Sequence, residues 1–323
     1  MESPHWDLVG IVDLKQDNLN RAAALYGLTG SQVSISLDDA VKAWKPDAAL
    51  VVVGAEAHNS VTIDALEHGL HCLVEKPIAL TMSGAREMVE TASRTGLKLM
   101  VSQNYRYKRA PLTIKKFLKK GIIGDIGSVF LNFQKSPYFT GFRIEIDEPL
   151  ITDMAIHHFD QMRNILELEP VSVLAYSWNT SWSRFRGNPA ATVLFEMNNG
   201  AVISYTGSWV SQGWETPWDG DWCIRGHGGE VRWKRNQLAF RTTNLLQEVY
   251  TKGALETAGE LALDLIDLPE EDRWASLGEF ANAIHEDREP FTSGKDNLNT
   301  LAMVIGACKS IELKREVSIK ELL

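Results

Sequence analysis

A regular alternation of short apolar runs with segments of helical periodicity fills the first hundred residues, and it constrains the fold more than any other feature. The apolar runs predict strands, and the segments between them, which end at a glycine or before a proline, predict helices. The predicted strands are 8–12, 33–35, 48–53, 71–74 and 97–101, and the predicted helices are 18–26, 38–44, 61–68 and 83–95. Strands and helices that alternate at this spacing form βαβ units in a doubly wound parallel sheet.

The pattern changes after residue 105, and we place a domain boundary there. Period-two apolar runs, separated by turn signals such as Asn198-Asn199-Gly200, predict a large, mostly antiparallel sheet that is open on one face. The predicted strands are 127–133, 171–178, 191–197, 201–209, 222–225, 230–233 and 237–241, and the predicted helices are 111–120, 150–166, 272–286 and 297–314. The sequence therefore predicts an α/β protein with a first domain, 1–105, and a second α/β domain, 106–323, whose C-terminal helices pack back on the first.

Two long connections in the second domain, 137–147 and 181–189, lie outside these predicted elements. Long connections in compact domains are often functional. We therefore expect these two loops to be functional.

The composition excludes several classes of partner. The chain of 323 residues carries a net charge of −9 and thus lacks the broad basic surface that nucleic acid requires. Its three cysteines, Cys72, Cys223 and Cys308, have neither metal-ligand spacing nor a disulfide framework, which fits a reducing compartment. No apolar run is long enough to span a membrane, and no signal peptide is visible. We expect a cytoplasmic protein that binds no nucleic acid, membrane or metal.

The strand at 71–74 runs directly into Glu75, Lys76 and Pro77. Proline cannot donate to a sheet ladder, so the strand ends here. Glu75 and Lys76 then lie at the carboxyl end of a parallel strand, which is where open α/β sheets bind ligands. A lysine at such a crevice can hydrogen-bond a substrate oxygen and stabilise developing charge. The alternative interpretation is a surface ion pair at a strand end.

Asp13 closes the first predicted strand. In dinucleotide-binding folds an acidic residue at a strand end accepts hydrogen bonds from the adenosine ribose, and it repels the 2′-phosphate of NADP. The alternative interpretation is an aspartate that interacts with the N-terminus of the following helix.

Asp153 and His157 lie four residues apart in the predicted helix 150–166, and therefore share one helical face. A histidine with a carboxylate one turn away can act as a general base near neutral pH. Two alternatives remain: a partly buried histidine that is satisfied by its helix neighbour, and a zinc site that includes His158. The zinc site is disfavoured because adjacent helical residues point about 100° apart.

These motifs, in this order and spacing, resemble the glucose–fructose oxidoreductase / inositol dehydrogenase / rhizopine-catabolism (Gfo/Idh/MocA) family. The resemblance rests on the Glu75-Lys76-Pro77 strand end, the segment Asn104-Tyr105-Arg106-Tyr107 at the domain crossing, and the Asp153/His157 pair. His58, five residues beyond the strand 48–53, and the segment 222–233 support it. The resemblance covers nearly the whole chain.

The resemblance implies an NAD(P)-dependent oxidoreductase that transfers a hydride between nicotinamide and a hydroxyl-bearing carbon of a sugar, cyclitol or related polyol. It implies a Rossmann-like first domain and a homo-oligomer formed through the open sheet. NAD is favoured over NADP because of Asp13. The implied site residues are Lys76, Asp153 and His157 for catalysis; Asp13, His58, Glu75, Lys76 and Asn104 for the cofactor; and Lys76, Tyr105, Arg106, Asp153 and His157 for the substrate.

One departure from the family pattern affects the cofactor site. The family begins with a strand, a glycine-rich turn and a helix whose N-terminus holds the pyrophosphate, and this sequence contains no G-x-G-x-x-G segment. Three explanations stay open: a start upstream of the recorded chain, a sheet in which another segment fills the gap, or a loss of cofactor binding. The alternative function is a non-catalytic sugar-binding or scaffold relative, and a redox-neutral glycosidase is a smaller possibility.

Overall fold

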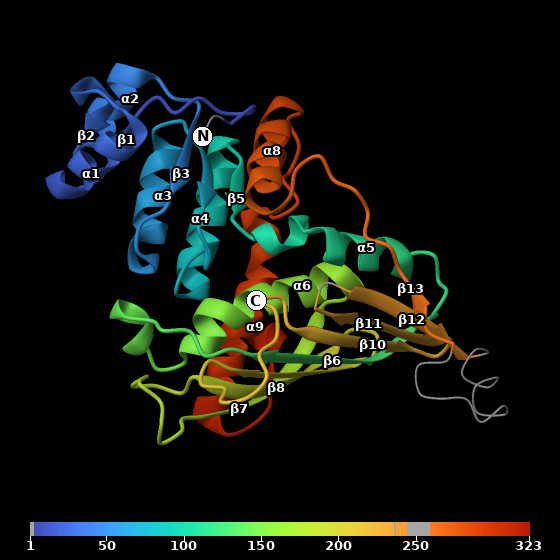
Figure 1. Cartoon of the computed structure of the whole chain (residues 1–323). Coiled ribbons are helices and arrows are strands. Elements are labelled where there is room, and N and C mark those ends of the chain that lie inside the picture. The colour runs from blue at the N-terminus through green and yellow to red at the C-terminus, as the bar shows by residue number, and fades with distance from the viewer. Residues whose placement is uncertain (1–2, 236, 244–258) are drawn as a thin grey trace. The chain divides into compact units, whose positions relative to one another are not determined.

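The fold is described from a computed structural model of the chain, in which residues 3–235, 237–243 and 259–323 are described (Figure 1). The chain divides into two compact units. The first combines Met1–Ser102 with Arg273–Asn297, and the second combines Gln103–Asp272 with Leu298–Leu323. No helix of the described residues is long and apolar enough to cross a membrane.

The first unit contains short parallel strands and the helices that connect them (Figure 1). Strands β4 and β5 are almost fully buried, as expected for apolar runs in a parallel sheet whose faces are covered by helices. The strands are β1 (Ile11–Val12), β2 (Val33–Ser34), β3 (Ala48–Val51), β4 (His71–Val74) and β5 (Leu99–Val101), and the helices are α1 (Gln16–Tyr26), α2 (Leu37–Trp44), α3 (His58–Glu67), α4 (Met82–Thr95) and α8 (Asp272–His285).

The predicted parallel pairing is confirmed, but the strands form two sheets instead of one. Strand β1 pairs with β2, and β3, β4 and β5 form a separate three-stranded sheet. Within the described residues no strand joins β1 to β3, so the explanation in which another segment fills the gap is wrong for this part of the chain. The predicted strands 8–12 and 48–53 are shortened because β1 and β3 each have one partner, and Leu8 and Val52 are exposed.

The second unit is built on a nine-stranded sheet in the order β13-β12-β11-β10-β6-β9-β8-β7-β14. Strands β6 and β9 pair in parallel, and all the other neighbours are antiparallel, which confirms the predicted class. The strands are β6 (Ile126–Gln134), β7 (Pro170–Trp178), β8 (Ala190–Met197), β9 (Val202–Ser208), β10 (Asp221–Gly226), β11 (Gly229–Lys234), β12 (Gln237–Thr242), β13 (Leu261–Ala262) and β14 (Val317–Ser318).

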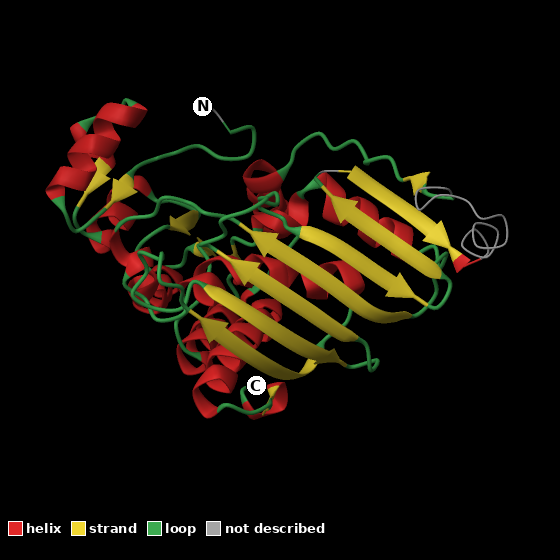
Figure 2. Ribbon diagram, turned by 60° about the horizontal axis from the view of Figure 1, so that its bottom comes forward, coloured by secondary structure: helices red, strands yellow, loops and turns green. Residues whose placement is uncertain are grey.

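Helices cover one face of this sheet and leave the other open (Figure 2). The helices of the second unit are α5 (Arg109–Leu118), α6 (Ile156–Leu166) and α9 (Gly294–Leu313), whose first residues belong to the first unit. On the open face, Leu174, Leu194 and Phe130 lie in register across β7, β8 and β6, with Ser204 of β9 between the last two. All three apolar side chains are more than a third exposed, as the predicted open face requires.

The predicted helix 150–166 is two consecutive helices of different kinds. Leu150–Ala155 forms a π-helix, and α6 begins at Ile156. The predicted helix is therefore confirmed over its whole length, but its first six residues are π-helical and not α-helical. Short π-helical segments are rare and occur frequently at functional sites, and this one contains Asp153.

Candidate active site and cofactor site

Lys76 lies at the carboxyl end of β4, in the first unit. The ladder of β3 and β4 continues one residue beyond the strand, since the Glu75 N–H donates to the Val51 carbonyl (3.0 Å). The Lys76 N–H then donates to the Glu75 carboxylate (3.2 Å), and the Lys76–Pro77 peptide bond is cis. The backbone of this segment is thus fixed on a buried strand, at the edge where open parallel sheets bind ligands.

His58 holds the connections that follow β3 and β4 together. Its side chain is only 2% exposed. Its Nδ1 lies 2.7 Å from the Pro77 carbonyl oxygen, and its Nε2 lies 3.2 Å from that of Val53. Both ring nitrogens therefore contact backbone, and His58 links these two connections, while its role in cofactor binding stays a prediction.

Asp13 follows β1 and precedes α1. One carboxylate oxygen accepts from the Lys15 N–H (2.7 Å) and the other from the Asn18 side chain (2.9 Å). Both hydrogen bonds lower the pKa of Asp13, and the one from the Lys15 backbone has the larger effect. The carboxylate is thus held in one orientation, with acceptor capacity left on each oxygen for the hydroxyls of a ribose.

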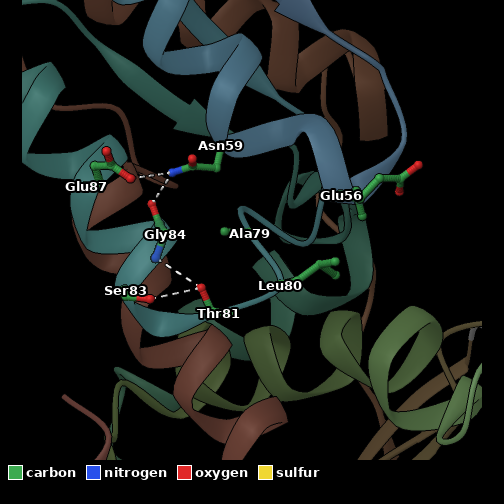
Figure 3. A pocket seen from close by; sticks show the side chains of 9 residues that line it. Glu56, Asn59, Ala79, Leu80, Thr81, Ser83, Gly84 and Glu87 are labelled. Carbon is green, nitrogen blue, oxygen red and sulfur yellow. Dashed lines mark hydrogen bonds between the residues drawn. The ribbon is translucent and has the colours of Figure 1, made fainter.

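A cavity of about 520 Å³ opens between the N-terminal ends of α3 and α4 (Figure 3). Asn59 donates to the Gly84 carbonyl (2.8 Å) and to Glu87 (3.2 Å) at its wall. None of the predicted site residues lines this cavity, and two carboxylates, Glu56 and Glu87, do. Its walls come from the two connections that contact His58 and from the first turns of α3 and α4.

The second unit places Tyr105 against His157. The two rings are stacked with centroids 4.5 Å apart and an interplanar angle of 17°. The Lys108 ammonium lies 3.3 Å from the centroid of the Tyr105 ring and pairs with Asp219 (2.9 Å). His157 and the Lys108 ammonium both lie too close to the phenol ring to share one of its faces, so Tyr105 is held between these two side chains. The imidazole of His157 therefore has a fixed platform.

Asp153, in the π-helix, forms an ion pair with Arg143, whose Nε donates to the carboxylate (2.5 Å). The Asp153 side chain is 15% exposed and that of Arg143 is 37% exposed. Arg143 comes from the loop 137–147 that the sequence marked as functional. The sequence did not indicate which residue of that loop meets Asp153.

Arg106 is committed to a buried carboxylate. Its Nε and Nη2 both donate to Asp160, each at 2.6 Å, and the two side chains are 10% and 1% exposed. Thr300 of α9 also donates to Asp160 (2.9 Å). This arrangement gives Arg106 a structural role at the base of η3, the 3₁₀ helix Asn104–Tyr107, and its contact with substrate stays a prediction.

Asn104 is buried, and its side-chain amide donates to the Asp272 carboxylate. The structure therefore gives the predicted cofactor-binding Asn104 a partner within the second unit. Lys76, Glu75, His58 and Asp13 belong to the first unit, whereas Asn104, Tyr105, Arg106, Asp153 and His157 belong to the second.

His158, next to the predicted base, is fully buried, and its Nε2 lies 2.9 Å from the Trp218 carbonyl oxygen. Burial lowers the pKa of His158 from 6.5 to about 4. Between these values the unfolded chain binds a proton that the folded chain does not. We therefore expect stability to fall as the pH drops through this window, by up to roughly 3 kcal/mol.

Denaturant unfolding at several pH values checks this expectation. In His158→Gln, the free energy of unfolding should decrease less between pH 6.5 and pH 4 than it does in the wild type. His285→Gln changes an exposed histidine on α8, and the free energy of unfolding should decrease with pH as it does in the wild type. If His158→Gln lost as much stability between pH 6.5 and pH 4 as the wild type does, the buried His158 would not be the cause of that loss.

Comparison with known proteins identifies the family. Residues 1–103 match the model described as an oxidoreductase family with an NAD-binding Rossmann fold, and residues 112–232 match the GFO/IDH/MocA C-terminal domain. The chain belongs to the Gfo/Idh/MocA oxidoreductase family. The resemblance drawn from the sequence motifs is thereby confirmed, and the first unit is an NAD-binding Rossmann domain.

Several members of the Gfo/Idh/MocA family are similar along nearly the whole chain. A 1,5-anhydro-D-fructose reductase from Ensifer adhaerens is 26% identical over 93% of this chain and 88% of its own. A D-apiose dehydrogenase from Paraburkholderia graminis is 25% identical over 98% of this chain and 84% of its own. The crystal structure of an oxidoreductase from Agrobacterium radiobacter in complex with NAD⁺, L-tartaric acid and magnesium has a TM-score of 0.84 and 22% identity, and covers 98% of this chain and 92% of that chain.

Proposed function

We propose that this chain is an NAD-dependent dehydrogenase of a sugar, cyclitol or related polyol, with Lys76, Asp153 and His157 as its catalytic residues. The observation that carries the proposal is the fixed His157, stacked on Tyr105, with Asp153 in the adjoining π-helix of an NAD-binding family member. Relatives named as a reductase of anhydrofructose and a dehydrogenase of apiose support the substrate class.

The chain has residues suited to bind both the adenosine half and the nicotinamide half of NAD. Asp13 offers an oriented carboxylate to the adenosine ribose, and Glu75 and Lys76 lie at the strand end where the nicotinamide half would be held. NAD supplies the hydride acceptor when it is bound. The sequence contains no G-x-G-x-x-G turn for the pyrophosphate, so cofactor affinity is the quantity to measure first.

Each catalytic side chain has a distinct task in this proposal. The imidazole of His157 accepts the proton of the substrate hydroxyl, as a general base does. The Lys76 ammonium hydrogen-bonds the same oxygen and stabilises the negative charge that develops on it. Asp153, held by Arg143, orients the substrate beside His157. Tyr105 keeps the imidazole in place.

We also propose that the protein is cytoplasmic and assembles into a homo-oligomer through the open sheet face. Its three cysteines are free, which suits a reducing compartment. The row of exposed apolar side chains on the open face, Leu174, Leu194 and Phe130, supports an interface there. Leu194→Lys with a sedimentation measurement would test this.

The experiment that tests the proposed function is a calorimetric titration of the 323-residue chain with NAD and NADH, followed by a turnover screen with polyols. We expect micromolar binding, and Asp13→Ala should weaken it by about tenfold or more, because hydrogen bonds to a charged group contribute roughly 1.5–3 kcal/mol. Asp17→Ala, in the first turn of α1, is the matched control and should bind as the wild type does.

The other outcomes are equally informative. A folded chain with no NAD affinity but with retained carbohydrate binding would overturn the proposal in favour of a non-catalytic sugar-binding or scaffold protein. Turnover of a glycoside without net NADH formation would point to a glycosidase. The observation that favours this second function is 32% identity over 127 residues to a glycosyl hydrolase family 109 protein of Akkermansia muciniphila.

A further inference from the structure

The loops 137–147 and 181–189 of the second unit are joined through their backbones. The Arg186 N–H donates to the Ile144 carbonyl (2.8 Å), and the Asn188 N–H donates to the Asp147 carbonyl (2.7 Å). Gly187 lies between these bonds, and a Cβ atom there would collide with the Asp147 carbonyl. The two loops therefore form one structural element.

This loop pair delivers the Arg143 side chain to the candidate active site. Arg143 lies in a short 3₁₀ turn, Gly141–Ile144. Its guanidinium carbon is 5.2 Å from the centroid of the Phe139 ring and 4.8 Å from that of Phe142. With its Nε bonded to Asp153, the guanidinium is fixed by two aromatic rings and one carboxylate.

The way in which Arg143 holds Asp153 differs from the pairs formed by the buried arginines Arg106 and Arg163 of the same unit. Arg106 contacts Asp160 through Nε and Nη2, and Arg163 contacts Glu169 through the same two nitrogens. Arg143 uses Nε alone, and among the described residues neither of its Nη nitrogens has a hydrogen-bond partner. Four N–H donors thus remain on a side chain that is 37% exposed.

These donors have a preferred ligand chemistry. A guanidinium is planar, and its paired N–H groups match two adjacent oxygen atoms, as in a carboxylate. Two neighbouring hydroxyls of a polyol present a similar pair of acceptors. The exposed ring of Phe142 beside the guanidinium offers an apolar surface to the CH face of such a molecule.

We propose that Arg143 is a specificity-determining residue that binds two adjacent oxygen atoms of the substrate through its Nη groups while its Nε holds Asp153. This inference rests on the proposed function, because it deepens the account of the same site. It assigns to the loop pair the recognition of substrate oxygens away from the reacting carbon.

The test combines kinetics with a binding measurement that needs no turnover. Kinetic constants of the wild type, Arg143→Met and Arg143→Lys are measured with myo-inositol, D-glucose and D-glucuronate. In parallel, the ¹⁵N NMR signal of the Arg143 side chain, assigned by its loss in Arg143→Lys, is followed as each compound is added. Arg186→Met is the matched control, because Arg186 is an exposed cation of the same loop pair that contacts exposed Asp147.

We expect Arg143→Met to raise KM about tenfold or more with kcat within about threefold, which corresponds to the loss of a binding contact of about 1.4 kcal/mol. Arg143→Lys should show a smaller increase in KM than Arg143→Met, and Arg186→Met should show no increase. A larger effect with D-glucuronate than with D-glucose identifies a carboxylate as the pair of oxygens, and equal effects identify a diol.

Two results would overturn the inference: a fall in kcat with unchanged KM, which would limit Arg143 to holding Asp153, or the absence of any shift in the Arg143 signal with all three compounds. A shift without turnover by the wild type would uphold the inference and overturn the proposed dehydrogenase function. The two failures are thus distinguishable.

Discussion

Lys76→Met is expected to lower kcat by about 10²–10³-fold, since removal of one donor that stabilises a developing oxyanion has effects of this size. The lysine follows a strand whose backbone is paired through Glu75, so the substitution removes an ammonium without altering the strand. The unfolding midpoint should stay close to that of the wild type. Steady-state kinetics with the best polyol from the turnover screen, together with thermal unfolding, would measure both quantities.

The control for this prediction is Lys42→Met. Lys42 lies on exposed α2 of the same unit and forms a helical ion pair with Asp38. A fully solvent-exposed pair of this kind contributes little to stability, so activity should not change. Wild-type turnover in Lys76→Met would remove Lys76 from the catalytic set. Lost turnover accompanied by a lowered unfolding midpoint would assign it a structural role instead.

Asp160→Ala is expected to destabilise the second unit by about 3–5 kcal/mol, because it leaves the Arg106 guanidinium buried without its carboxylate. Asp160 also accepts from Thr300, whose hydroxyl in turn accepts from Arg163 (2.9 Å). The substitution therefore breaks a chain of contacts between η3, α6 and α9. Urea unfolding followed by tryptophan fluorescence would report the change in midpoint.

Two further variants keep this prediction testable if Asp160→Ala does not fold. The double variant Arg106→Met/Asp160→Leu replaces the pair with apolar side chains and should recover most of the lost stability. Asp147→Ala removes an exposed aspartate from its pair with Arg186 and should change stability by about 1 kcal/mol at most. An Asp160→Ala protein as stable as Asp147→Ala would show that the buried pair contributes little.

The sequence predicted the longer strands of the second unit, β6 to β12, because buried and more exposed residues alternate along most of them, whereas the two-residue strands β13 and β14 were not predicted. In β6, for example, buried Val129, Leu131 and Phe133 alternate with more exposed neighbours, and this period of two is visible in the sequence. The same logic failed for β1, where an apolar run of five residues gives a strand of two. Its length depends on a neighbouring strand, and that information is absent from the run itself.

The candidate site was predictable where its residues lie on regular elements. Asp153 and His157 were found from their spacing, and Lys76 from its place after a strand. Arg143 was missed because loop residues have no periodicity, although the length of its loop indicated a functional segment. The pairing of Arg106 with Asp160 joins residues 54 positions apart, and spacing does not encode such contacts.

The backbone bonds that join the loops 137–147 and 181–189 have a consequence for how the binding site can change during evolution. Carbonyl and N–H groups are common to nearly all amino acids, so most side chains of these loops can be exchanged while the bonds between the loops persist. Gly187 is one exception, because a Cβ atom there would collide with the Asp147 carbonyl. A lineage can therefore acquire a new substrate by substituting residues such as Arg143 and Phe142 while the loop geometry is inherited unchanged.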